Sequence, residues 1–202
     1  MMHLQQILDE LRQFSTPELC DGATDMQTMD YHIHQMVGTR RIVGTAFPIQ
    51  VFRGVSGIIP DALHEVQPGQ IIVIAGHGEC QRSYWGDHRS ICASLQKAEG
   101  VIIDGAFRDI DGCEQVDMPI FARAVTPRSA RKEPEGRWNV PVRCGGVLVQ
   151  PNDIIVADRN GVCVFSLEDA PSIIKNARRK MIAQDKTITE MKKTGKLLTR
   201  VL

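Results

Sequence analysis

Apolar residues recur at helical spacing at both ends of the chain. In the segment 2–13 they fall on one face, which predicts an amphipathic helix: Leu4, Ile7, Leu8 and Leu11. A second helix is expected from Ser15 to about Met26, because a hydroxyl residue followed by a proline, with Glu18 three residues on, is typical of a helix N-terminus. The segment 167–193 predicts a long basic helix at the other end.

Short apolar runs and turn signals alternate through the middle of the chain. Strands are expected at 42–51, 71–75, 101–103, 119–125, 147–149, 153–157 and 161–165, the last two joined by an Asn-Gly hairpin. Helices are expected at 60–66 and 87–99, a Gly-rich loop at 76–85 and an exposed loop at 128–137. The alternation predicts a layered α/β fold, partly parallel and partly antiparallel, with helices at both chain ends.

Composition sets limits on the class of protein. With 202 residues, the chain is expected to form one domain over 1–202, with 168–202 as a basic helical arm. Its apolar runs are too short for a membrane helix, and its first residues do not resemble a secretory signal. The six cysteines lack the spacing of a zinc ribbon. We therefore expect reduced thiols and a cytoplasmic protein with no membrane partner.

Charge is unevenly distributed although its sum is zero. From Glu168 to the end the chain has nine Lys/Arg and four Asp/Glu, a net charge of +5 that leaves −5 on the remainder. A basic tail can bind nucleic acid, but this one has no aromatic residues for base stacking. We expect a solvated helix that packs on the acidic body or on a neighbouring molecule.

Two charged motifs lie within 76–109, a stretch whose two ends fall where an expected apolar strand gives way to a loop. Gly86-Asp87 stands at the start of the helix expected at 87–99, and Arg108-Asp109 follows the strand expected at 101–103. Ligands of α/β proteins usually bind at the carboxyl ends of strands. Arg108 offers a planar fork for a carboxylate, and Asp87 and Asp109 offer hard oxygen ligands for Mg²⁺ or Mn²⁺. The alternative is structural: Asp87 caps a helix, and Arg108 and Asp109 form a surface ion pair.

These motifs and their spacing resemble those of the RraA-like proteins, which include class II 4-hydroxy-4-methyl-2-oxoglutarate aldolases. The resemblance covers roughly 15–165 and is most specific where twenty residues separate Asp87 from Arg108-Asp109. Other matching segments are Ser15-Thr16, Gly44-Thr45-Ala46, Val101-Ile102-Ile103-Asp104-Gly105, Pro141-Val142, Gly145-Gly146-Val147, Pro151-Asn152-Asp153, Ala157-Asp158 and Gly161-Val162. The resemblance implies a three-layer β/β/α swivelling-domain fold that assembles as a homotrimer or homohexamer, with sites between subunits.

The resemblance also implies roles for individual residues. Arg108 would bind the carboxylate and keto oxygen of a pyruvate-like group, Asp109 would hold the divalent metal, and Asp87 would order water bound to it. Gly86 and the backbone N–H groups of His88 and Arg89 would form the carboxylate site at a helix N-terminus.

An acid from the adjacent subunit is implied as well. Asp21, on the second expected helix, would help to handle the proton. The run Asp87-His88-Arg89-Ser90 departs from the family by placing two basic side chains near the site, which suggests a different or more anionic substrate.

The leading hypothesis is a metal-dependent lyase that acts on a 2-oxo dicarboxylic acid and releases pyruvate. The reaction would be retro-aldol cleavage or decarboxylation of oxaloacetate, with a divalent cation as electrophile in place of a Schiff-base lysine. The alternative is a non-enzymatic regulator resembling the ribonuclease E inhibitor, a family member that departs from the Arg-Asp pattern. A third hypothesis is a structural oligomer with a vestigial site.

Overall fold

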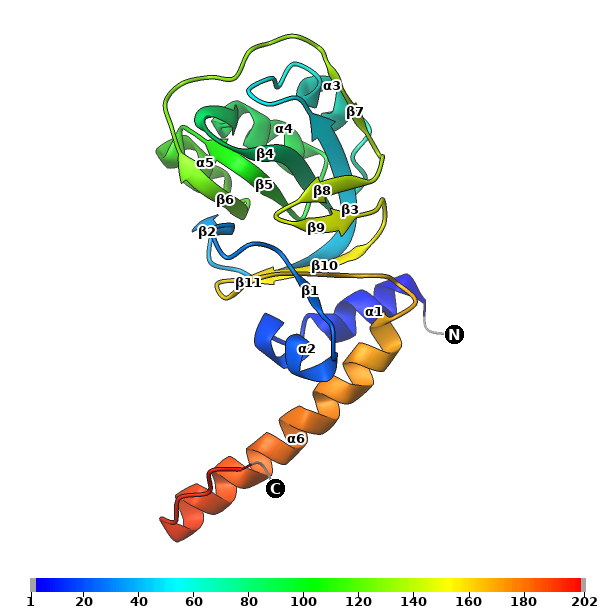
Figure 1. Cartoon of the computed structure of the whole chain (residues 1–202), viewed down its shortest axis with the longest axis vertical. Coiled ribbons are helices and arrows are strands. Elements are labelled where there is room, and N and C mark those ends of the chain that lie inside the picture. Colours follow the sequence, from blue (N-terminus) through cyan, green and yellow to red (C-terminus); the bar gives the residue numbers. More distant parts are fainter. Residues whose placement is uncertain (1–2, 201–202) are drawn as a thin grey trace.

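A mixed nine-stranded sheet forms the centre of the computed structural model, which describes residues 3–200 (Figure 1). Its strands are β1 (Gln27–Thr28), β2 (His34–Val37), β3 (Ile42–Val51), β4 (Gln70–Trp85), β5 (Gly100–Phe107), β6 (Ile120–Val125), β7 (Gly136–Trp138), β10 (Ile154–Asp158) and β11 (Gly161–Phe165). The order is β1-β11-β10-β3-β4-β5-β6-β2, and β7 also pairs with β3. The strands β3 to β6 are parallel, and the pairings of the others are antiparallel.

The parallel strands are covered on both faces. On one face lie the helices α3 (Ile59–Leu63), α4 (Asp87–Leu95) and α5 (Ile110–Val116), whose apolar side chains pack against those of β3 to β6. On the other face lies a hairpin, β8 (Val142–Cys144) and β9 (Val147–Val149). Strands covered on both sides read as continuous apolar runs, which is why the expected strands in this region were recognisable.

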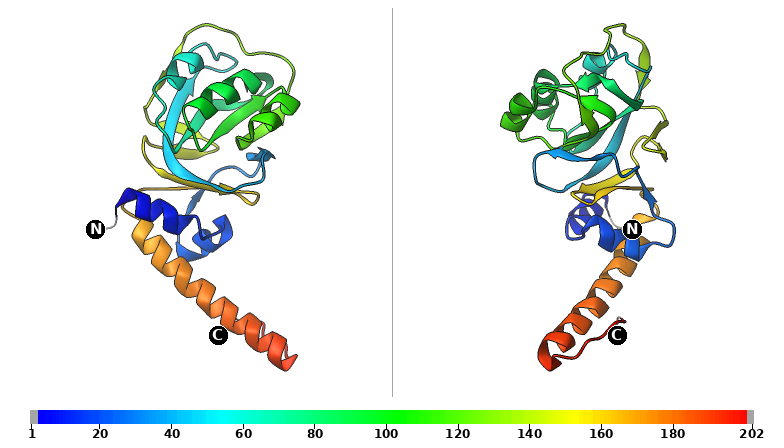
Figure 2. Two further views of the ribbon diagram at one scale, coloured as in Figure 1. Left: turned by 180° about the vertical axis from the view of Figure 1, so that it is seen from behind. Right: turned by 60° about the vertical axis from the view of Figure 1, so that its left-hand side comes forward.

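Helices from the two chain ends form a third cluster beneath β10 and β11. These are α1 (Leu4–Leu11), α2 (Thr16–Gly22) and the first turns of α6 (Ala170–Thr194). The predicted capping box at Ser15 is present, because Glu18 Oε2 accepts from the Ser15 N–H at 2.7 Å. The rest of α6 extends away from the sheet as an arm (Figures 1 and 2). The predicted α/β fold with helices at both ends is thus confirmed.

The prediction of a loop at 76–85 was wrong, because β4 continues through this segment to Trp85. His77 and Gly78 take left-handed backbone angles, with φ of 57° and 68°, and the register against β5 shifts after Ile74. The bulge lets the strand resume, and Tyr84 and Trp85 are buried.

The strand expected at 101–103 also runs further, to Phe107. Asp104 is tolerated inside it because its carboxylate accepts from the Arg123 guanidinium and, at 3.0 Å, from the Gly145 N–H. The helix α5 that follows was not predicted.

Four predicted helices end earlier than expected, and those placed at 2–13 and 60–66 end at Leu11 and Leu63. The helix placed at 15–26 ends at Gly22, where the backbone of Ala23 becomes extended. The helix placed at 87–99 ends at Leu95, because Lys97 adopts a left-handed conformation with φ of 59°. In the first helix, α1 begins at Leu4, and residue 2 of the expected segment lies outside the described residues.

Two further predictions from the sequence concern membrane helices and the state of the cysteines. Within residues 3–200, no helix has the length and hydrophobicity needed to span a bilayer. All six cysteines are free thiols, and Cys113, Cys144 and Cys163 are buried.

Candidate functional site

The two charged motifs meet because the strands before them are parallel neighbours. Trp85 at the end of β4 pairs with Phe107 at the end of β5, and the Arg108 N–H donates to the Trp85 carbonyl at 3.1 Å. Gly86-Asp87 and Arg108-Asp109 therefore start from the same edge of the sheet. α4 begins at Asp87 and α5 begins directly after Asp109, so both helix N-termini lie at this edge.

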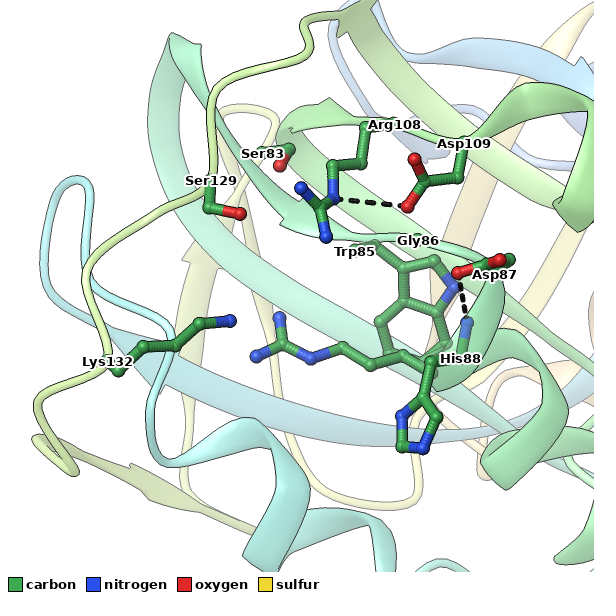
Figure 3. Close-up of a pocket in the computed structure, with 10 residues that line it drawn as sticks. Ser83, Trp85, Gly86, Asp87, His88, Arg108, Asp109, Ser129 and Lys132 are labelled. Atoms are coloured by element: carbon green, nitrogen blue, oxygen red, sulfur yellow. Dashed lines mark hydrogen bonds and ion pairs between the residues drawn. The ribbon is translucent and has the colours of Figure 1, made fainter.

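A cavity of ≈ 260 Å³ lies at this edge (Figure 3). Most of its lining is polar or charged, and it consists of Ser83, Trp85, Gly86, Asp87, His88, Arg89, Arg108, Asp109, Ser129 and Lys132. Six of the seven residues singled out from the sequence thus line one cavity. Polar groups that converge on a pocket can fix the orientation of a bound ligand.

Arg108 and Asp109 form an ion pair on one wall of the cavity. Arg108 Nε lies 3.1 Å from Asp109 Oδ2, and the two side chains are 42% and 39% exposed. Asp109 adopts a left-handed conformation, with φ of 58° and ψ of 50°, which aspartate tolerates better than most residues. In Figure 3 the guanidinium of Arg108 points into the cavity, where it can donate to an anion.

Two glycines allow the carboxylates to approach the backbone closely. A Cβ atom at Gly86 would lie 2.7 Å from Asp109 Oδ2, and one at Gly112 would lie 2.7 Å from the Cβ of Asp87. Any side chain at position 86 would displace the Asp109 carboxylate. Gly86 is therefore explained by this close approach, since its own φ of −171° is open to all residues.

The cavity offers two carboxylates as oxygen ligands for a hard divalent cation. Asp87 and Asp109 supply carboxylate oxygens, and within residues 3–200 no cluster of three or more His, Cys, Asp or Glu side chains could hold a metal by itself. Mg²⁺ usually binds through one or two carboxylates and keeps its other positions for water and substrate oxygens. Zinc sites, in contrast, need three or four protein ligands with nitrogen or sulfur.

One implied contact is already used within the protein. The His88 N–H, expected to bind a substrate carboxylate, donates to Asp87 Oδ1 at 2.6 Å. The His88 imidazole is exposed and, in Figure 3, points away from Arg108 and Asp109. His88 therefore contributes to the rim of the cavity in this structure.

Arg89 and Lys132 add positive charge to the lining of the cavity. The Arg89 guanidinium donates to the carbonyls of Tyr84 and, at 3.0 Å, Ser56. Burial, together with repulsion from Arg108, lowers the pKa of Arg89 to about 10. Burial, followed by repulsion from both arginines, also lowers the pKa of Lys132. No carboxylate within the described residues 3–200 pairs with either cation, although Arg89 braces the fold through neutral acceptors.

One candidate from the sequence lies outside this cavity. Asp21 is exposed on α2, which lies beyond β10 and β11 at the opposite end of the molecule from α4 and α5 (Figures 1 and 2). Its implied role thus depends on a second subunit.

Sequence reasoning missed the wall contributed by the segment 128–132. It was read only as an exposed loop, but Ser83 N–H donates to the Arg128 carbonyl at 2.7 Å and Ala130 N–H donates to the Ser83 carbonyl at 3.0 Å. These bonds bring Ser129 and Lys132 over the cavity. Local sequence gave no such signal, because the contact joins residues about 45 positions apart.

Comparisons with known proteins show which proteins this chain resembles. A family model described as RraA-like, Aldolase/RraA, matches residues 16–164. A protein from Halalkalibacterium halodurans named "Putative 4-hydroxy-4-methyl-2-oxoglutarate aldolase" is 34% identical over 182 residues, covering 87% of this chain and 85% of that protein.

Two solved structures extend the comparison to the fold. An uncharacterized protein from Pseudomonas syringae has a TM-score of 0.84 at 26% identity and covers 98% of this chain and 96% of its own. The RNA-processing inhibitor RraA from Thermus thermophilis has a TM-score of 0.70 at 26% identity. This match covers 75% of this chain and 92% of that protein. The arm formed by α6 lies outside the family match.

Proposed function

Because this chain belongs to the RraA-like family, and because Arg108, Asp109 and Asp87 line one cavity, we propose that it is a divalent-metal-dependent lyase. Its substrate would be a 2-oxo dicarboxylic acid, cleaved to pyruvate by retro-aldol reaction or, for oxaloacetate, by decarboxylation. The convergence of one arginine and two carboxylates in a single cavity carries this proposal. A relative that is named as an aldolase supports it.

In the proposed mechanism Arg108 binds and orients the reacting end of the substrate. Its guanidinium can donate to the carboxylate and the 2-oxo oxygen together, so its positive charge lies beside the oxygen that becomes negative as the C–C bond breaks. Asp109 holds the guanidinium through Nε and leaves the terminal nitrogens for the substrate.

Asp109 and Asp87 would hold Mg²⁺ or Mn²⁺, which when bound supplies Lewis-acid polarisation of the 2-oxo acid. Gly86 keeps room for the Asp109 carboxylate. No lysine needs to form a Schiff base in this scheme. Lys132, which lines the cavity, is assigned instead to the distal end of the substrate.

The distal carboxylate would be bound by Arg89 and Lys132, together with the rim residue His88. The two cations have no acidic partner within residues 3–200, and a buried or crowded positive charge is stabilised by an anionic ligand. This assignment accounts for the basic residues that follow Asp87.

The proposal includes a homotrimer or homohexamer in which Asp21 of one subunit reaches the site of the next. There the Asp21 carboxylate would accept the proton of the hydroxyl group during cleavage. The protruding α6 supports an oligomeric assembly, because an isolated helix of this kind gains little stability without a partner surface. Light scattering should give about 67 or 135 kDa, three or six times 22.5 kDa; a monomer at micromolar concentration would remove the role of Asp21.

A cytoplasmic location belongs to the same proposal and is supported by the six free thiols, which a reducing compartment preserves. Fractionation of cells that express the tagged protein tests it. Recovery of the protein with an oxidising compartment would contradict the assignment.

Pyruvate release tests the function directly. Purified protein should release pyruvate from oxaloacetate and from 4-hydroxy-4-methyl-2-oxoglutarate, lose this activity in EDTA and regain it with Mg²⁺ or Mn²⁺. A no-enzyme control with each metal is needed, because oxaloacetate decarboxylates slowly in solution. Full turnover after complete removal of metal would refute the metal-dependent mechanism.

The fold similarity to an RNA-processing inhibitor favours one alternative, a non-enzymatic regulator that binds a ribonuclease. The two functions predict different effects of Asp109→Asn. A lyase loses pyruvate release, whereas a regulator without activity releases none to begin with and binds its ribonuclease equally well before and after the change.

A further inference from the structure

A second, apolar groove opens directly from the candidate site. Its volume is ≈ 470 Å³, and it shares His88, Arg89 and Lys132 with the cavity described above. Beyond these shared residues its walls come from α3 and α4, with Pro60, Leu63, Cys92 and Leu95 as the apolar lining. The cavity and the groove are therefore two parts of one continuous surface.

Two hydrogen bonds engage the side-chain amide of Gln96, which is part of the groove wall. Gln96 Nε2 donates to the carbonyl of Leu63 at 3.1 Å and to that of His64 at 3.2 Å. Leu95 in contrast is 78% exposed, so core packing does not account for this apolar side chain. An apolar ligand group would cover it, and burial of apolar surface is favourable.

The order of chemistry along this surface specifies a ligand. First come Arg108 and two carboxylates, which suit a 2-oxo acid. Next come Arg89 and Lys132, which pair with no carboxylate of residues 3–200, and then the apolar lining of the groove. A substrate that matches this order has a reacting 2-oxo acid, a second carboxylate three carbons away, and an apolar group on the carbon that bears this carboxylate.

We propose that the substrate is a 4-hydroxy-2-oxoglutarate whose C4 carries a hydrocarbon group larger than methyl, seated in the groove lined by Leu63, Cys92 and Leu95. This inference rests on the proposed lyase function. Cleavage breaks the bond between C3 and C4, and its electron pair stays on C3. The C4 hydroxyl loses its proton and becomes a ketone, and C3 takes up a proton. The products are pyruvate and a 2-oxo acid with the apolar side chain, and no other reactant is needed.

A substrate substituent fits the groove better than a second copy of this chain. The groove begins at the uncompensated charges of Arg89 and Lys132, and an apolar protein surface laid over them would bury those charges unpaired, which is costly. The anionic carboxylate of a substrate would pair with them instead.

The test compares two substrates within each protein variant. 4-Hydroxy-4-(2-methylpropyl)-2-oxoglutarate and its 4-methyl analogue are cleaved in parallel, and both 2-oxo acid products are quantified by chromatography. The wild type should favour the larger substrate in kcat/KM by about tenfold, the order expected for a few methylene groups in an apolar pocket. Leu95→Gln should reduce this ratio about tenfold, chiefly through KM.

The matched control is Ile91→Gln on the same helix. Ile91 is 48% exposed and lies outside the groove lining, so this change should leave the ratio unaltered. Since both positions are exposed, both variants should fold, and melting curves check this.

The outcomes separate the two levels of the proposal. If the wild type cleaves neither compound and does not decarboxylate oxaloacetate, the proposed function fails and this inference fails with it. If oxaloacetate is turned over but the methyl analogue is preferred, or if Leu95→Gln leaves the ratio unchanged, the apolar subsite alone is refuted. If Leu95→Gln dissociates the oligomer and lowers both activities equally, the groove is a subunit interface and the inference is overturned.

Discussion

Replacing Arg108 by lysine separates the chemistry of the site from the stability of the fold. Lysine keeps the charge and can still pair with Asp109, but it loses the planar fork that reaches two oxygens at once. The only ion pair of Arg108 within residues 3–200 joins two side chains that are 42% and 39% exposed. Such a pair contributes about 0.2–1 kcal/mol, so the melting temperature should change by no more than about 4 °C.

The expected effect on catalysis is much larger. If the fork binds the carboxylate and the 2-oxo oxygen, its contribution grows as charge develops on that oxygen. We expect kcat/KM for pyruvate release to fall at least ~100-fold, which corresponds to roughly 2.7 kcal/mol of transition-state stabilisation.

The assay is pyruvate release from oxaloacetate under saturating Mg²⁺, with thermal melting of each variant. Arg131→Lys is the matched control, because Arg131 lies in the neighbouring loop, is exposed and does not line the cavity. Its activity should equal that of the wild type. A folded Arg108→Lys protein with activity near the wild-type level would show that the site is wrongly assigned.

Three further changes probe the surroundings of the site. Gly86→Ala should displace the Asp109 carboxylate, whose Oδ2 lies 2.7 Å from the added Cβ, and raise the Mg²⁺ concentration for half-maximal activity about tenfold, as a metal titration would show. Lys132→Gln should raise KM for oxaloacetate several-fold at unchanged kcat; steady-state kinetics that show the reverse would exclude the distal-carboxylate role. Asp158→Ala should cost about 3 kcal/mol in urea unfolding, because it leaves the buried Thr16 N–H and hydroxyl without their acceptor; a loss under about 1 kcal/mol would contradict this.

Much of the fold was predictable because its signals are local. The strand at 42–51 and the hairpin strand at 161–165 were placed at their observed bounds, since continuous apolar runs and an Asn-Gly turn encode them directly. The extension of β4 to Trp85 was not predictable in this way. The extension depends on left-handed backbone angles at His77 and Gly78 and on pairing with β5. From the sequence alone, a Gly-rich segment at this position predicts a loop.

The same distinction applies to the site. Arg108-Asp109 was identified because it follows an apolar strand, and Asp87 because it begins an expected helix twenty residues before that pair. In the structure, the parallel pairing of β4 with β5 brings the two motifs together. Lys132 was missed because its position depends on hydrogen bonds between Ser83 and the chain around Arg128 and Ala130, far away in sequence. Its charge is visible in the sequence, but its location is a tertiary property.

The two halves of the site are therefore held by different means, and this bears on how substrate preference can change. Arg108 and Asp87 stand at the ends of paired strands, where the register of Trp85 with Phe107 sets their relative position. Lys132 lies in an exposed segment attached to β4 by a few hydrogen bonds. A substitution near Lys132 can alter the distal pocket without disturbing the sheet, whereas a register change in the strands would displace the reacting groups. We therefore expect substrate preference to respond chiefly to changes in 128–132 and in the α3–α4 groove, and the cleavage chemistry to respond chiefly to changes at the strand ends.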